Sequence, residues 1–136
     1  MTGDHRRALG RAGENTAARI LEEAGLVVRE RNWRAGRSGE LDLIAEDGAR
    51  IVVVEVRTRI GDHRGTALES VDARKIVRLR GLAARWAREH ECRRPVGVDI
   101  IALALDPADR DAILAAGPEA DLREFGARAN WVRGVA

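Results

Sequence analysis

The chain has 136 residues, of which 45% are hydrophobic and 34% are charged, and its formal net charge is +2. This length fits one globular domain with its own core, and the composition excludes a disordered or fibrous chain. No run approaches the roughly 18 apolar residues of a membrane span, so no membrane segment is expected.

The N-terminal residues and the single cysteine lead us to expect a cytoplasmic protein. The first ten residues (MTGDHRRALG) are polar and basic and lack the apolar segment of a secretory signal. Cys92 stands alone, which excludes a disulfide within the chain and a cysteine-based zinc site. His5, His63 and His90 are scattered and form no ligand pattern.

Basic residues are concentrated in the middle of the chain. Residues 64–94 carry nine cations and four acids, whereas residues 95–136 carry four cations and seven acids. Lys75 is the only lysine beside 23 arginines. The basic excess is therefore local, and the number of arginines by itself does not indicate nucleic-acid binding unless they cluster in space.

The first half of the chain predicts a helix followed by three strands. Apolar residues recur with helical spacing over residues 6–24, and Gly25 is a typical helix end. Strands are predicted over residues 26–33, 40–45 and 51–59. Asp47-Gly48 is a strong signal for a two-residue hairpin turn between the last two strands. The Val52-Val53-Val54 run indicates a central strand that is buried on both faces.

The second half predicts a helix and a buried strand. A loop over residues 60–67 leads to a long helix over residues 68–91, and residues 96–105 form the fourth strand. Beyond Pro107 the pattern weakens to a short helix at 112–116 and an edge strand or extension at 122–132. The order of elements predicts a single α/β domain, residues 1–136, with a mixed sheet of four to five strands flanked by helices.

The hairpin brings acidic residues to one face of the sheet. With Asp47-Gly48 in the turn, paired residue numbers sum to 95, so Asp42 faces Val53. Strand alternation then places Glu40, Asp42, Glu55 and Arg57 on one face. Asp42 and Glu55 become diagonal neighbours, roughly 7–8 Å apart. Two carboxylates this close repel each other unless a cation bridges them, and oxygen ligands favour Mg²⁺ or Mn²⁺.

A solvent-exposed strand face is the alternative explanation for these acids. The position of Glu55 within VVVEV argues against it, because burial is expected there and an unpaired buried charge is costly. Glu14 lies at the edge of the apolar stripe of the first helix, where it could join the same metal site. It could equally be stabilised by the helix dipole or by an arginine.

The long helix carries two basic features. Lys75 projects from the middle of an apolar face formed by Leu68, Val71, Leu79, Leu82 and Trp86. A lysine in that position usually extends its ammonium to water; alternatively, it reaches the carboxylates. Arg74, Arg78, Arg85 and Arg88 form a separate stripe that is suited to phosphates.

Several segments together resemble a known family. They are GRAGENTAA (residues 10–18), RNWR (31–34), GELDLIA (39–45), VVVEVRTR (52–59), Lys75 and VDII (98–101). In this order and spacing, the chain resembles the YraN family of bacterial proteins, which has a restriction-endonuclease-like fold similar to that of Holliday-junction resolvases. The resemblance covers a core of about residues 8–105 and leaves residues 106–136 as a C-terminal extension.

The resemblance implies a site of the PD-(D/E)xK nuclease superfamily. Asp42 and Glu55 look like its metal-binding acids, Glu14 is similar to the additional glutamate of resolvases, and Lys75 matches a lysine common in the family. The chain departs from the family at Arg57, where a lysine is usual. Arginine can hold a phosphate, but its high pKa prevents it from transferring protons.

Two functional classes follow from these residues. The first is a Mg²⁺- or Mn²⁺-dependent endonuclease that acts on branched or structured DNA, with Asp42, Glu55, Arg57 and Lys75 as catalytic residues. The second is a nucleic-acid-binding module of nuclease ancestry with weak or no catalysis. A structural or partner-binding protein would leave the carboxylates unexplained. A homodimer is expected by analogy, because a junction presents two strands to a resolvase.

Overall fold

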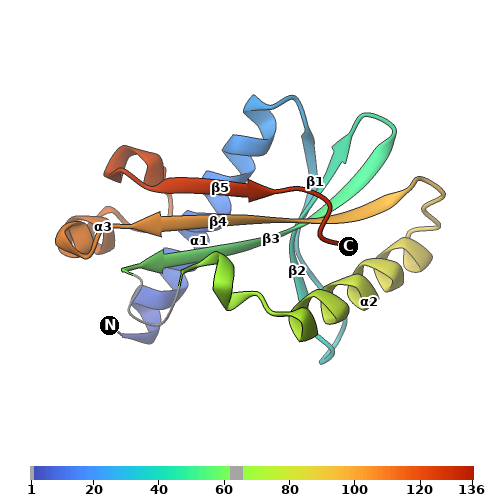
Figure 1. Ribbon diagram of the computed structural model, residues 1–136, viewed down its shortest axis with the longest axis horizontal. Coiled ribbons are helices and arrows are strands. Elements are labelled where there is room, and N and C mark those ends of the chain that lie inside the picture. Colours follow the sequence, from blue (N-terminus) through green and yellow to red (C-terminus); the bar gives the residue numbers. More distant parts are fainter. Residues whose placement is uncertain (1, 62–65) are drawn as a thin grey trace.

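In the computed structural model, which describes residues 2–61 and 66–136, a five-stranded mixed sheet lies between helices (Figure 1). The strands, in spatial order, are β1 (Val27–Arg34), β2 (Glu40–Asp47), β3 (Arg50–Ile60), β4 (Val96–Leu105) and β5 (Arg128–Val132). The helices are α1 (Gly3–Glu23), α2 (Ala73–Glu89) and α3 (Arg110–Ala116). Strands β3 and β4 are parallel, and the other neighbours are antiparallel. The predicted α/β fold is confirmed, and it is consistent with a restriction-endonuclease-like architecture.

Two apolar cores hold the helices against opposite faces of the sheet. Leu21 of α1 and Ile113 of α3 pack with Val52 and Val54 on one face. On the other face, Val53 packs against α2 through its buried residues Leu79, Leu82, Ala83 and Trp86. The run at positions 52–54 therefore supplies both cores, as expected for a central strand. None of the helices within the described ranges is both long and apolar enough to cross a membrane.

Helix α2 begins later than the sequence predicts. Residues Leu68–Ser70 form a separate 3₁₀ turn, and the helix starts at Ala73. Asp72 has an extended backbone, and its side chain accepts a hydrogen bond from the Lys75 backbone N–H at 2.9 Å. Such a cap satisfies a donor that the first turn leaves free, and it sets where the helix starts. Part of the predicted loop, residues 62–65 with His63, lies outside the described residues.

The hairpin turn is displaced by one residue from its predicted position. Asp47 pairs with Arg50, so Gly48 and Ala49 form the turn and paired residue numbers sum to 97. Gly48 has φ = +60°, a conformation that glycine adopts without steric cost. The predicted pairing of Asp42 with Val53 is therefore wrong, because Val53 pairs with Ile44. The sum changes by two, so each residue now faces a partner two positions farther along the other strand. Side chains alternate with a period of two, so the same residues still share a face.

The C-terminal extension completes the sheet. Strand β5 pairs with β4, and the buried Asp99 of β4 receives hydrogen bonds from Trp131 Nε1 (3.0 Å), Arg133 Nε (2.7 Å) and the Gly134 backbone N–H (2.8 Å). A buried carboxylate needs such donors. The segment predicted as an edge strand or extension therefore contains both: a 3₁₀ turn (Leu122–Phe125) and then the edge strand.

Helix α1 crosses β3 so closely that one position excludes a side chain. A Cβ atom at Gly13 would lie 2.0 Å from Thr58 Oγ1. We therefore expect Gly13→Ala to lower the free energy of unfolding by about 1–3 kcal/mol, the usual cost of overpacking, as measured by urea denaturation. Gly10→Ala is the matched control on the same helix, because a Cβ there meets nothing within 4 Å. It should stabilise the helix by up to about 1 kcal/mol. Equal effects of the two variants would contradict this close approach.

Candidate metal-binding and catalytic site

The candidate site lies where β2 and β3 separate. The last pair that joins these strands at this end is Leu43 with Val54. Continuing the same register places Asp42 opposite Glu55, one residue beyond that pair. There Asp42 Oδ2 accepts a hydrogen bond from the Val56 backbone N–H at 2.9 Å, so a side chain replaces the strand pairing. The two acids that the sequence predicted as diagonal neighbours thus meet just beyond the last strand pair.

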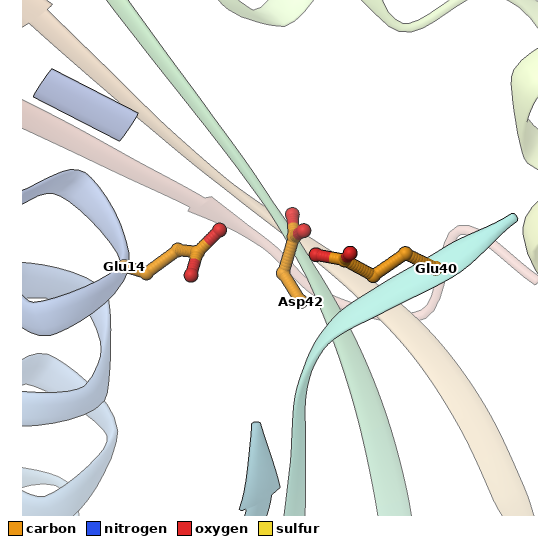
Figure 2. A group of neighbouring side chains, drawn as sticks. All are labelled: Glu14, Glu40 and Asp42. Carbon is orange, nitrogen blue, oxygen red and sulfur yellow. The ribbon is translucent and has the colours of Figure 1, made fainter. Parts of the chain in front are cut away.

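Three carboxylates converge in this fork. Oxygen atoms of Glu14, Glu40 and Asp42 all lie within 4.8 Å of one another. Figure 2 shows Glu14 extending from α1 toward Asp42 on β2, with Glu40 pointing at the same place from the start of β2. The donor set consists of carboxylate oxygens alone, which suits Mg²⁺ or Mn²⁺. Of the three acids, the sequence placed Glu40 on the correct face but did not identify it as a ligand.

Asn32 of β1 holds two of these acids and was missed in the sequence. Its Nδ2 lies 2.9 Å from Glu14 Oε1 and 2.9 Å from Glu40 Oε1. Its neighbours pair with the neighbours of Asp42, so Asn32 faces Asp42 across β1 and β2. Asn32 has φ = +53°, a conformation that asparagine tolerates better than most residues. The asparagine inside the RNWR segment was the available signal, but its role depends on the register of β1 against β2 and on the packing of α1.

Glu55 is held by two cations. Its side chain is 5% exposed, and its Oε2 lies 3.2 Å from Lys75 Nζ and 3.3 Å from an Arg57 guanidinium nitrogen. Lys75 therefore reaches the carboxylates from α2, which was one of the two alternatives for this residue. A second guanidinium nitrogen, Arg57 Nε, is buried without a hydrogen-bond partner among the residues that the structure describes. A buried donor without a partner costs free energy until an acceptor binds.

The crowding of acids changes their protonation. Burial, followed by the hydrogen bond and the charge of Glu55, raises the pKa of Asp42 to about 9, although the Val56 N–H opposes this effect. Burial also raises the pKa of Glu14, against the lowering effect of its hydrogen bond to Asn32. In the metal-free chain, the ionised forms of both carboxyl groups are therefore disfavoured, because too little positive charge lies beside them. A bound divalent cation would supply that charge and release the proton.

A cleft of about 830 Å³ contains the site. Four acids and five bases line it: Glu14, Glu40, Asp42, Glu55, Arg6, Arg57, Arg59, Lys75 and Arg110. The predicted common face of Glu40, Asp42, Glu55 and Arg57 thus opens into one cleft. Arg6 and Arg110 come from the first turn of α1 and the start of α3, and nothing in the sequence pattern linked them to the acids.

The arginine stripe of α2 lies elsewhere. None of Arg74, Arg78, Arg85 and Arg88 lines this cleft as the described residues define it. Arg78 donates to the Ser38 carbonyl at 2.9 Å, and Arg85 donates to the Ala35 carbonyl at 3.4 Å and to Glu89 at 3.3 Å. Two members of the predicted phosphate-binding stripe therefore hold the connection between β1 and β2.

Comparison with known proteins identifies relatives over most of the chain. A family model described as "Uncharacterised protein family UPF0102" matches residues 13–103. A UPF0102 protein of Acidothermus cellulolyticus is 52% identical over 93 residues, which cover 68% of this chain and 70% of the relative. A UPF0102 protein of Streptomyces coelicolor is 50% identical over 95 residues, covering 70% and 73%. One from an Arthrobacter species is 42% identical over 106 residues, covering 77% and 89%.

Proposed function

The chain belongs to the UPF0102 family, known also as the YraN family, and we propose that it is a divalent-metal-dependent endonuclease that acts on branched or structured DNA. The observation that supports this most is the convergence of Glu14, Glu40 and Asp42 beside the ion pair of Glu55 with Lys75. An exposed acidic face would not bury Glu55 or bring a lysine from another element to it. The action on DNA and a cytoplasmic location belong to this proposal.

Glu14, Glu40 and Asp42 would hold the cation. When bound, Mg²⁺ or Mn²⁺ would polarise the scissile phosphate and make a bound water more acidic. Asn32 keeps Glu14 and Glu40 in place by donating to both of them. Glu55, fixed by Lys75 and Arg57, is placed to orient the attacking water.

Lys75 and Arg57 together take the role that a single motif lysine has in the PD-(D/E)xK superfamily. The Lys75 ammonium is a compact cation, and its contact with Glu55 allows it to stabilise the charge that develops on the phosphate. Arg57, whose side chain is 34% exposed, can bind phosphate through its guanidinium, but it cannot exchange protons at neutral pH. Arg57 is also the observation that favours the second candidate function, a DNA-binding module with little catalysis.

Arg57→Lys separates these two functions. We expect this variant to nick a branched DNA substrate in Mn²⁺ faster than the wild type, by about tenfold or more, since general acid–base groups contribute on the order of 10²–10⁴-fold. Manganese binding, measured by calorimetry on the same samples, should change little. Manganese binding without nicking by either protein would support the binding module. No manganese binding at all would overturn the metal site.

A homodimer also belongs to the proposal, because two clefts could then act on two strands of one junction. Sedimentation of the protein with and without junction DNA would measure the oligomeric state. A protein that stays monomeric and binds the junction as a single chain would contradict the dimer and leave the nuclease proposal intact.

A further inference from the structure

Three arginines surround the carboxylate site from elements that are far apart in the sequence. Arg6 belongs to the first turn of α1, Arg59 to the end of β3, and Arg110 is the first residue of α3. All three line the same cleft as the acids. Helix α1 packs against α3, so two segments that are far apart in the sequence lie beside each other.

The charge balance of the cleft depends on a bound cation. Five bases and four acids give a formal charge of +1, and a divalent cation would raise it to +3. Phosphodiester groups would then be attracted to a site whose acids alone would repel them. Arg57 lines the same cleft and its side chain is 34% exposed, so its guanidinium also faces an approaching phosphate.

The alternative basic surface is less suited to DNA. On the outer stripe of α2, Arg78 and Arg85 already donate to the backbone carbonyls of Ser38 and Ala35. To bind phosphate, they would have to release the connection between β1 and β2. The cleft arginines would require no such release, since the cleft is already open around them.

We propose that Arg6, Arg59 and Arg110 form the phosphate-binding track that leads one DNA strand to the carboxylate site, and that the α2 stripe does not bind DNA. This inference rests on the proposed function and names the surface that grips the substrate. A cleft of about 830 Å³ falls within the range of roughly 300–1,000 Å³ typical of small-ligand sites, which is enough for a few nucleotides of one strand.

The track draws on segments on both sides of the family core. Arg6 and Arg110 lie outside residues 13–103, the segment that the family model matches, whereas Arg59 lies inside it. The substrate grip therefore combines one residue of the matched segment with two residues from outside it. The C-terminal extension contributes Arg110 as well as the edge strand of the sheet.

The test compares two double variants that each remove two positive charges. Arg6→Gln with Arg110→Gln changes the track, and Arg74→Gln with Arg88→Gln changes exposed members of the α2 stripe. Binding of a fluorescein-labelled four-way junction is measured by anisotropy between 50 and 200 mM salt, with Ca²⁺ in place of the active metal. Manganese affinity and thermal stability are measured for each protein.

The track variant should bind the junction DNA more weakly than the wild type, and its DNA binding should depend less on salt. Each phosphate contact contributes about 0.7–0.9 to the slope of log K against log salt, so losing two contacts should reduce the slope by about 1.4–1.8. The α2 variant should keep the wild-type slope, and all proteins should keep their manganese affinity. Arg6→Gln alone, at an exposed position, should give about half of the change and provides a second measurement if the double variant folds poorly.

The outcomes distinguish this inference from the function on which it rests. If the slope of log K against log salt decreases in the α2 variant and is unchanged in the track variant, the assignment of the phosphate-binding track is wrong and the proposed function stands. If the wild type binds manganese but shows no salt-dependent DNA binding, the proposal that DNA is the substrate is wrong, and so is the proposed phosphate-binding track.

Discussion

Asp42→Asn is expected to abolish divalent-metal binding and DNA cleavage while making the metal-free protein more stable. The amide retains an oxygen that can accept the Val56 N–H, so the fork between β2 and β3 should keep its shape. It removes the charge that converges with Glu14 and Glu40. Because the cation contributes several kcal/mol to such reactions, cleavage should fall on the order of 10³-fold or more.

The stability effect follows from the raised pKa of Asp42. The folded protein keeps this proton above the ordinary pKa of 3.8, where the unfolded chain has lost it. The stabilisation is complete below about pH 4 and is lost progressively as the pH rises toward the folded pKa of about 9. At pH 8 we expect the variant to exceed the metal-free wild type by at least about 2 kcal/mol, since each pKa unit corresponds to about 1.4 kcal/mol.

Calorimetric manganese titration, a nicking assay and thermal unfolding between pH 5 and 9 measure the three effects. Glu46→Gln is the matched control, because this acid lies on the same strand but pairs with Arg29 and Arg94, and its pKa is lowered by its hydrogen bonds to those arginines. Removing its charge should slightly destabilise the protein and leave manganese binding unchanged. Undiminished cleavage by Asp42→Asn would disprove the site.

Lys75→Met should produce the second-largest loss. Methionine preserves the packing of the side-chain stem but removes the ammonium, which lies 3.2 Å from Glu55 Oε2. Cleavage should fall by about 10²-fold or more, the lower range for a positioned acid–base or charged group. Manganese affinity should change little, because the three converging carboxylates remain. Glu55 also remains paired with Arg57, so the protein should stay folded.

A lysine at position 57 should rescue this loss. Lys75→Met combined with Arg57→Lys restores one ammonium beside Glu55 from β3, and the double variant should cleave faster than Lys75→Met alone. Arg74→Met, at the exposed neighbouring position of α2, is the control for the loss of a positive charge. Wild-type cleavage by Lys75→Met would show that the ammonium takes no part in the reaction.

Local patterns predicted much of the fold. The two helices, the four strands of the core and the two-sided burial of Val52, Val53 and Val54 follow from the periodicity of apolar residues. The errors occurred where one hydrogen bond decides between alternatives. Asp72 ends the extended segment and delays α2, and the Asp47–Arg50 pair moves the turn to Gly48 and Ala49. Neither choice changes the apolar pattern, so the pattern could not reveal it.

The candidate site was predictable only in part. Asp42 and Glu55 share a hairpin, so strand alternation was enough to place both on one face, although the exact register was wrong. The role of Glu40 depended on where β2 leaves β3, since its oxygens meet the others beyond the last strand pair. The α2 arginines were predicted from their helical spacing, but two of them contact loop carbonyls that spacing along one helix cannot reveal.

The sequence by itself determined the α/β class, the family and the hairpin acids, because these depend on local patterns and on the order of short motifs along the chain. Only the tertiary structure decided that Glu14, Asn32 and Lys75 meet those acids. The three residues come from α1, β1 and α2, and their meeting depends on how closely the helices pack on the sheet, as at Gly13. The same packing brings Arg6 and Arg110, which are far apart in the sequence, to one cleft. Contacts between distant segments are fixed by the packing of the whole core, and no local pattern encodes them.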